Sequence, residues 1–562
     1  MWITGQESGG IERLIRLFSA LKGFIRPNAF NWLSLNWLVL VAFQFGCSSL
    51  PRCRPHGGPE TKAPPDPNIE SYHVIRVNSD GFLIDLRPHN HQALIKDRAA
   101  AQEYLEETLF AGFAKSGKKK ILLFVHGGLN DTTQGMQHFW GDYQRILAGE
   151  YYPVFVVWPS GWASTYVEHL IWVRQGIKAE TAREKAFSIG TVPFVLVADL
   201  GRALTRLPLV VANNSKSDVE TSTAIRNSDG GAAVRQYQQL VADNYHVTIG
   251  DDYSRLSDRS VRAITYWATL PIKYFAASLI DGLGTPAWDN MLRRTQTVYP
   301  SRLDDLERRR LQEAQVTQTN MATAQISSGK SPSQRFLSRR EEKKMQRYLA
   351  AGLPLFMNEL QKREGKDVSE VTLVGHSMGS IILNRVVRDS NMNFANIVYM
   401  GAACSIADFE DSMLPYLKAH RGTQFYNESL HPVAETGELN NSLFDLPPRG
   451  SLLVWIDNFF GNPSTEHDRT FGAWRNLFRS GPTGEPIIKE FFKDDRNGIG
   501  LKDRLHFRAF SVGFGTADQL RSAKYQWNEN PERKDLQQRC DNPLTHGEFS
   551  EMPYWESSFW WP

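Results

Sequence analysis

The chain has 562 residues, more than one ordinary domain needs, so we expect a core enlarged by insertions or joined to a second domain. Its 64 basic and 61 acidic residues nearly cancel, and they are interspersed along the chain. A nucleic-acid partner is therefore not expected, because binding to a phosphate backbone needs concentrated positive charge. Four cysteines are too few for a disulfide-built scaffold, and none forms a C-x-x-C pair.

The first 47 residues resemble an export or anchoring segment. Scattered basic residues in 1–28 precede an uncharged apolar stretch at 31–45, which ends near Cys47 in a pattern similar to the lipidation site of bacterial lipoproteins. Three interpretations stay open: a lipoprotein acylated at Cys47, an uncleaved signal anchor, and an amphipathic helix on a soluble protein. We expect a membrane-anchored or periplasmic protein of the bacterial cell envelope, with 48–68 as a flexible Pro- and Gly-rich linker.

Folded structure is expected to begin near Ser71, and its pattern is that of alternating strands and helices. A helical pattern at 133–147 joins two strand-length apolar runs, and another at 380–388 joins a second such pair. This alternation predicts an α/β fold with a mostly parallel central sheet flanked by helices. The expected strands, of which the first two flank a hairpin turn at 78–81, are 72–77, 82–86, 121–125, 153–157, 371–375, 396–400, 423–426 and 506–512.

A large insertion separates the two halves of this pattern. About two hundred residues lie between the fourth and fifth core strands, far more than a connecting loop needs. We assign 69–160 and 366–562 to the core and 161–365 to a mostly helical insertion or cap. Apolar segments predict helices that pack over the core or form a lid or membrane-facing surface. Two polar stretches, 213–231 and 317–333, are expected to be disordered.

The segment with the clearest chemistry is Gly375-His376-Ser377-Met378-Gly379, which follows an apolar strand and precedes a helical pattern. In a G-x-S-x-G turn the flanking glycines permit a sharp bend that lifts the serine hydroxyl above the sheet. The following helix directs its positive dipole end at this position. The context predicts that Ser377 is a nucleophile.

A second glycine-bearing loop is expected to complete an oxyanion hole. The strand at 121–125 ends in His126-Gly127-Gly128-Leu129, where paired glycines allow close approach of the backbone. We expect the amide of Gly128 or Leu129 to donate alongside that of Met378. His126 is expected to orient this loop.

These two motifs, followed after the fourth strand by Trp158-Pro159-Ser160, resemble the α/β-hydrolase superfamily, in a poorly characterised esterase- or lipase-like branch. The resemblance covers about 71–160 and 365–556. It implies the α/β-hydrolase fold, a catalytic triad in the chain order serine, acid, histidine, and commonly ester hydrolysis.

The general base should follow the last core strand, and among the later histidines His546 fits that place. The acid is less determined, because carboxylates follow both the sixth and the seventh strand. We favour Asp408, and Asp411, Glu428 and Glu435 remain alternatives. Cys404 and Cys540 fall near these segments, and whether they are bridged stays open.

The leading functional hypothesis is a serine esterase acting on small, lipid or other acyl esters through an acyl-enzyme. Transfer to an acceptor other than water stays open. The alternative is a non-catalytic envelope module that binds partners on a retained hydrolase fold. We expect no cofactor and no metal site, because no dinucleotide fingerprint, P-loop or zinc spacing appears. Besides the substrate and the membrane, no partner is indicated.

Overall fold

A computed structural model describes most of the chain from residue 66 onward. The described residues are 66, 68–90, 92–128, 132–171, 173–174, 177–179, 181–227, 245–250, 259–300, 350–432, 435, 450–493, 500–512, 543 and 545–561. The segment 1–47, with Cys47, and the stretch 317–333 lie outside them.

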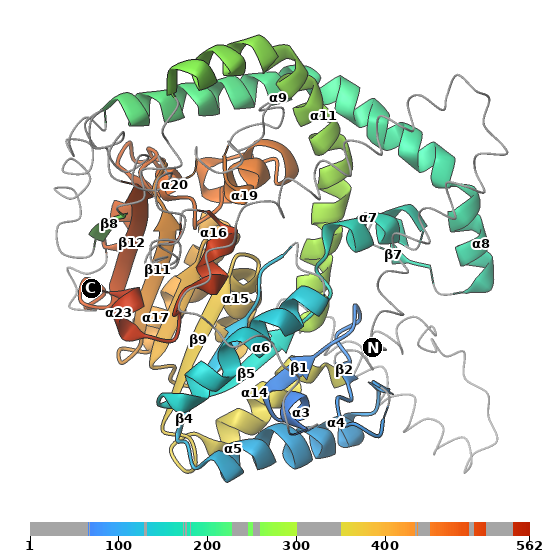
Figure 1. The fold of residues 1–562 in the computed structure, drawn as a ribbon, viewed down its shortest axis with the longest axis vertical. Helices are drawn as coiled ribbons and strands as arrows, with labels where there is room; N and C mark the ends of the chain where they lie inside the picture. Colours follow the sequence, from blue (N-terminus) through green and yellow to red (C-terminus); the bar gives the residue numbers. More distant parts are fainter. Residues whose placement is uncertain are drawn as a thin grey trace, which may run out of the picture.

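The centre of the molecule is an eight-stranded sheet in which every pairing is parallel (Figure 1). The predicted α/β class with a parallel sheet is confirmed. In spatial order the strands are β1 (Val74–Arg76), β5 (Tyr151–Val157), β4 (Lys120–Val125), β9 (Glu370–His376), β10 (Asn396–Met400), β11 (Gln424–Leu430), β12 (Leu505–Val512) and β8 (Tyr245–Gly250).

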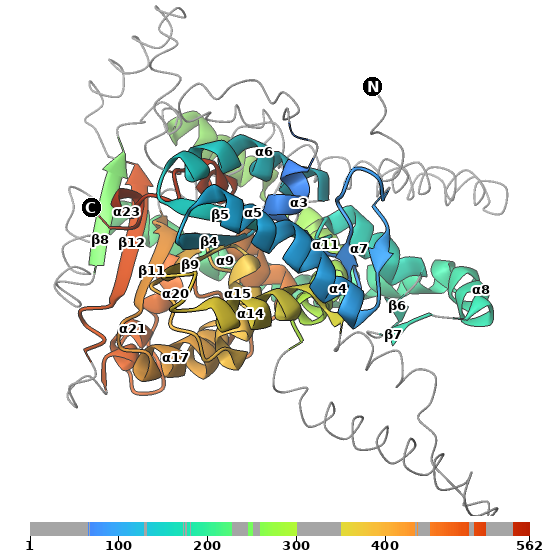
Figure 2. The ribbon, with the colours of Figure 1, turned by 90° about the horizontal axis from the view of Figure 1, so that it is seen from below.

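The central strands are nearly continuous apolar runs because both faces of the sheet are covered. On one face, α6 (Thr132–Ala148) and the C-terminal elements η9 (Gly547–Glu551) and α23 (Ser557–Trp560) supply apolar side chains. The opposite face packs against α4 (Arg98–Leu105), η1 (Glu106–Phe110), α5 (Ala111–Ser116), α14 (Gly352–Arg363), α15 (Gly379–Asp389), α16 (Ile406–Asp408), η5 (Phe409–Met413), α17 (Leu414–Ala419), α19 (Leu452–Trp455), η6 (Ile456–Phe460), α20 (Trp474–Leu477) and α21 (Ile487–Phe491). Figure 2 shows α6 on one side of the strands and α14, α15 and α17 on the other.

The described part of the segment between β5 and β9 is largely helical, and it also contributes a strand to the sheet. Its long helices α9 (Val192–Asn227) and α11 (Arg259–Val298) pack against each other, and α11 also packs against α7 (Trp162–Ile171). The hairpin of β6 (Val173–Arg174) and β7 (Ile177–Lys178) and helix α8 (Ala182–Gly190) project from the side of the core in both views. No helix among the described residues is long and apolar enough to span a membrane.

Four details differ from the sequence-based expectation. Residues 69–73 form α3 (Ile69–His73), so the first strand is shorter than 72–77, and β2 (Leu83–Ile84) pairs with β3 (Leu94–Ile95) outside the main sheet. The expected disorder at 213–231 is wrong up to residue 227, because this part continues α9. The strand β8 was not expected, and it joins β12 as an edge strand.

The strand order creates a switch point between β4 and β9. After β4 the chain passes through α6 to β5 on one side, whereas after β9 it passes through α15 to β10 on the other side. The loops that leave the carboxyl ends of these two neighbouring strands therefore diverge. In open α/β sheets, ligands bind in the crevice at such a point.

Candidate active site

Ser377 occupies the sharp turn between β9 and α15. Its φ of 52° lies in the left-handed region, which residues other than glycine rarely adopt because Cβ then crowds the backbone. Neighbouring backbone holds this conformation: the Ser377 amide donates to the Met400 carbonyl (2.9 Å), and the Ser377 carbonyl accepts from the Ala403 amide (3.0 Å). Strain that the surroundings enforce in this way is concentrated at functional positions.

The glycines that flank Ser377 are required by close packing. A Cβ at Gly379 would lie 2.2 Å from the carbonyl oxygen of Val125 on the neighbouring strand. A Cβ at Gly375 would lie 2.8 Å from the Leu383 side chain, in the first turns of α15. Because neither position carries a Cβ, the serine turn can pack closely against β4 and α15.

The glycine-bearing loop after β4 lies directly against the serine turn. A Cβ at Gly127 would lie 2.8 Å from the Ser377 Cβ, and a Cβ at Gly128 would lie 2.3 Å from the Met378 sulfur. The backbone of this loop can approach Ser377 so closely only because it carries no side chains there. Leu129, the other expected donor, lies outside the described residues.

His126 holds the loop in place. Its Nε2 accepts from the Trp158 amide (3.1 Å), so the ring carries its proton on Nδ1, which donates to the Gly127 carbonyl (2.8 Å). The ring also stacks on the Trp158 indole. Burial lowers the pKa of His126 to about 4, so the ring is neutral near pH 7. Both nitrogens are therefore engaged in fixing the loop.

His546 is buried beside the turn that follows β10. Its carbonyl accepts from Nε2 of His376 (3.0 Å), and the two ring centroids are 5.2 Å apart. A Cβ at Gly401 would lie 2.8 Å from Nδ1 of His546. Burial, and secondarily the neighbouring His376, lower the pKa of His546 well below its ordinary value. The imidazole is therefore neutral near pH 7 and able to accept a proton.

Ser377 is also buried: the whole residue, including its side chain, is only 1% exposed. Its Oγ makes no hydrogen bond to any residue that the structure describes. The contact with a base that would activate the hydroxyl is thus not formed in this state. Such contacts often form only when a substrate is bound.

The structure places Asp408, the favoured acid, against α15. Its Oδ2 accepts from Asn384 (2.6 Å) and its Oδ1 accepts from Arg388 (3.0 Å), both of which lie on that helix. Asp411 is exposed on η5, and Glu435 is buried, where it accepts from the hydroxyl of Ser451 (2.9 Å). In the described part of the chain, none of these three carboxylates forms a hydrogen bond or ion pair with His546.

Glu428 lies in a row of residues that crosses four strands. The pairing register sets His376 opposite Met400, Met400 opposite Glu428 and Glu428 opposite Arg508. Residues opposite each other in parallel strands point to the same face, and this is the face against which His546 lies. Among the four candidate acids, Glu428 alone belongs to this row.

The carboxyl group of Glu428 is fully buried, and neither oxygen has a hydrogen-bond partner in the described part of the chain. Burial raises its pKa well above the ordinary value, and the positive charge of Arg508 opposes that rise. Burial therefore favours the protonated form of this carboxyl group. A positive charge that develops nearby would favour its ionisation.

Two contributions to the site were missed in the sequence. Gly401 carries no distinctive sequence signal, because a single glycine after a strand is common and its contact with His546 joins positions far apart in the chain. His376 stands at a variable position of the serine motif, and the motif does not indicate that it donates to the His546 carbonyl. Cys404 is a buried free thiol, and Cys540 lies outside the described residues.

Comparisons with known proteins found no match: no protein-family model matches the chain, and no curated protein or solved structure matches it significantly.

Proposed function

We propose that this protein is a serine hydrolase that cleaves carboxylic esters, with Ser377 as nucleophile and His546 as general base. The observation that carries the proposal is the left-handed conformation of Ser377 at the carboxyl end of β9, at the switch point of the sheet. A glycine loop lies against one side of this turn. A buried neutral imidazole lies beside Gly401, one residue after Met400, whose carbonyl accepts from the Ser377 amide.

We also propose that the chain has the α/β-hydrolase fold. Two observations support this: β4 and β5 stand in reversed order within the sheet, and the glycine loop, Ser377, the carboxylate and His546 follow one another in that order along the chain. In α/β-hydrolases the nucleophile sits between a strand and a helix, the acid follows and the histidine comes last.

In the proposed reaction His546 removes the proton from Ser377 as Oγ attacks the ester carbonyl carbon. The negative charge that develops on the carbonyl oxygen is stabilised by the amides of Met378 and Gly128. The Ser377 amide does not serve, because it is bonded to Met400. The His546 imidazolium then protonates the departing alkoxide, and water activated by the same ring cleaves the acyl-enzyme.

Glu428 is the carboxylate we assign to the triad, in place of Asp408. When His546 becomes positively charged, the carboxylate form of Glu428, in the adjoining row, stabilises that charge. Asp408 is assigned instead to anchoring the segment after β10, since both of its oxygens are bonded to side chains of α15.

Lipid or other acyl esters are the substrate class we favour. Apolar side chains on α8 and α9 face solvent, among them Phe187 (72% exposed) and Phe194 (76% exposed). Exposed apolar surface is suited to contact with lipid. With the apolar stretch at 31–45, this supports a protein that works at the membrane of the bacterial cell envelope, as an anchored or periplasmic enzyme.

A fluorophosphonate probe and para-nitrophenyl esters of increasing acyl length test the proposal. We expect labelling and ester cleavage by the full chain, and loss of both in Ser377→Ala and His546→Ala. Ser558→Ala and His420→Ala are matched controls at an exposed serine and at a histidine bonded to Asn393, and both should behave as wild type.

The second candidate is a non-catalytic binding module, and the near-complete burial of Ser377 is the observation that favours it. The two candidates separate in the same experiment. Folded wild-type protein that neither reacts with excess probe nor cleaves any ester of the series would reject the hydrolase and leave the binding module.

A further inference from the structure

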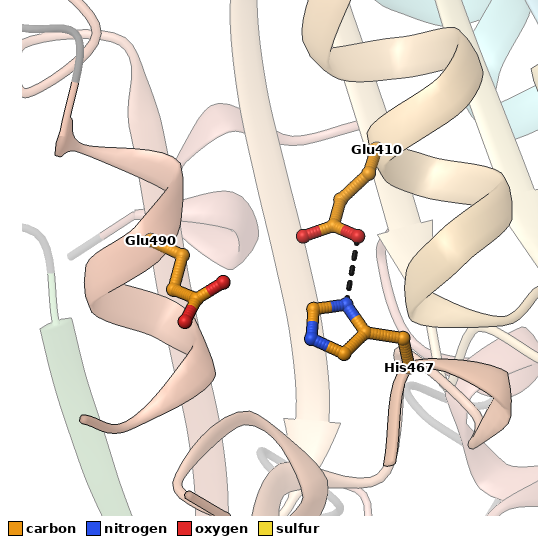
Figure 3. Close-up of side chains that lie close together, drawn as sticks. All are labelled: Glu410, His467 and Glu490. Atoms are coloured by element: carbon orange, nitrogen blue, oxygen red, sulfur yellow. Dashed lines mark hydrogen bonds and ion pairs between the residues drawn. The ribbon is translucent and has the colours of Figure 1, made fainter. Parts of the chain in front are cut away.

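Three side chains that can bind a metal converge from three separate segments, away from Ser377. Glu410 comes from η5, His467 from η7 (Glu466–Asp468) and Glu490 from α21. One ligand atom from each lies within 4.8 Å of the others, and Glu490 lies across from the hydrogen-bonded pair of Glu410 and His467 (Figure 3). Glu410 and His467 are 57 residues apart in the chain, and His467 and Glu490 are 23 residues apart, so no short sequence motif indicates the cluster.

The hydrogen bonds of His467 leave one nitrogen available. Its Nδ1 lies 2.8 Å from Oε2 of Glu410, an acceptor, so Nδ1 carries the proton and Nε2 presents a lone pair. That Nε2 is buried and has no hydrogen-bond partner among the described residues. A carboxylate that accepts from one imidazole nitrogen while the other binds a metal is a recurrent arrangement in metal sites.

The carboxylate of Glu490 is held in position on the other side. Its Oε1 accepts from the Thr483 hydroxyl (2.9 Å) and lies 3.5 Å from the ammonium of Lys493. A Cβ at Gly481 would lie 2.6 Å from the same oxygen, so the loop before α21 closes tightly over it. The Lys493 side chain is about half exposed and can move into solvent when a cation arrives.

The spacing fits an ion better than a direct contact. Glu490 makes no hydrogen bond to Nε2 of His467, yet one ligand atom from each of the three residues lies within 4.8 Å of the others. Zinc bonds to nitrogen and oxygen are about 2.0 to 2.2 Å long, so the ligand atoms of a tetrahedral zinc ion lie about 3.3 to 3.6 Å apart, and a small inward movement of the side chains would bring them to that distance.

We propose that His467 and Glu490, supported by Glu410, bind one divalent transition-metal ion of the zinc class. His467 contributes Nε2 and Glu490 contributes a carboxylate oxygen, Glu410 holds the imidazole in place through Nδ1, and water completes the shell. An imidazole together with a carboxylate suits zinc and its first-row neighbours better than magnesium or calcium, which prefer all-oxygen sites.

The ion would brace the loop that supports Ser377. Directly after His467, the segment 469–472 packs on the turn after β10: the Phe471 amide donates to Cys404 (2.8 Å) and the Gly472 amide donates to Ala402 (2.8 Å). The Ala403 amide in turn donates to the Ser377 carbonyl. The site is therefore structural, and it stands whether or not Ser377 is a nucleophile.

The test uses the full chain, freed of metal by a chelator and then titrated with zinc chloride in a calorimeter. We expect one zinc per chain that is lost in His467→Ala and weakened at least tenfold in Glu490→Gln, with a raised melting temperature only where zinc binds. His420→Ala, a partly buried histidine outside the cluster, should bind as wild type.

Cobalt(II) gives an independent readout, because its visible absorption reports nitrogen and oxygen ligation directly. The absorption should appear in wild type and in His420→Ala and should be absent in His467→Ala. Wild type that binds no stoichiometric metal, or folded His467→Ala and Glu490→Gln variants that bind zinc as tightly as wild type, would overturn the site.

Discussion

Gly401 lies directly beneath the imidazole of His546: a Cβ built on Gly401 would lie 2.8 Å from Nδ1 and 2.9 Å from Cε1. Gly401 also has a φ of 52°, and its amide donates to the carbonyl of Glu428 (2.8 Å). The glycine therefore brings the backbone of the β10 turn against the ring while it is bonded to the strand that carries Glu428. Gly401 therefore helps to position the proposed base, His546.

Gly401→Ala is expected to lower the kcat of ester cleavage by about a hundredfold or more, because displacement of a catalytic base has an effect of that size. The new methyl group would lie only 2.8 Å from Nδ1 and so displace the ring, and the left-handed backbone would be strained as well. The measurement is kcat on a para-nitrophenyl ester. Gly422→Ala is the control, because nothing lies within 4 Å of a Cβ there, and an equal loss in both variants would contradict the role of Gly401.

Ser377→Gly is expected to be more stable than Ser377→Ala, although both lack the nucleophile. The left-handed conformation costs a residue with a Cβ about 1 kcal/mol, and glycine avoids that cost. Urea unfolding followed by circular dichroism measures the difference. Equal free energies of unfolding would show that the turn stores no strain.

Glu428→Gln and Asp408→Asn separate the two proposed acids. Gln is neutral and nearly the same shape as Glu, and burial already disfavours the charged form of Glu428, so we expect a kcat lowered by about 10²- to 10⁴-fold with little change in stability. Asp408→Asn removes the charge that pairs with Arg388, so we expect slightly lower stability and a kcat within a few fold of wild type. The reverse pattern of kcat values would restore Asp408 as the acid.

Asp142→Asn is expected to stabilise the protein increasingly as the pH rises. Burial raises the pKa of Asp142 to about 8 from an unfolded value of 3.8, and its Oδ2 accepts from the hydroxyl of Tyr554 (3.0 Å). Between these pH values the folded state holds a proton that the unfolded state has lost, so the contribution of this group falls as pH rises.

The neutral amide of the variant removes that dependence. The free energy of unfolding of the variant, relative to wild type, should therefore rise by up to about 1.4 kcal/mol for each pH unit between pH 4 and 8. Unfolding by urea at pH 5 and at pH 8 measures it, with Asp367→Asn as an exposed control. A gain that is the same at both pH values would show that Asp142 is ionised in the folded protein.

The sequence alone determined the local elements of the core. The apolar runs at 121–125, 371–375 and 396–400 are strands, and the helical patterns at 133–147 and 380–388 are helices. These predictions succeed because parallel strands covered on both faces need continuous apolar runs and surface helices need a 3.6-residue period. The G-x-S-x-G motif marked Ser377 for the same local reason, since its two glycines adjoin the turn itself.

Only the tertiary structure decided which distant residues meet. The side-chain row that holds Glu428 is set by the register of four strands, and the contact of Gly401 with His546 joins positions 145 residues apart. The same is true of β8, which the insertion adds to the sheet, and of Glu410, His467 and Glu490. Local propensity carries no record of such pairings, because they depend on how complete strands and helices pack against one another.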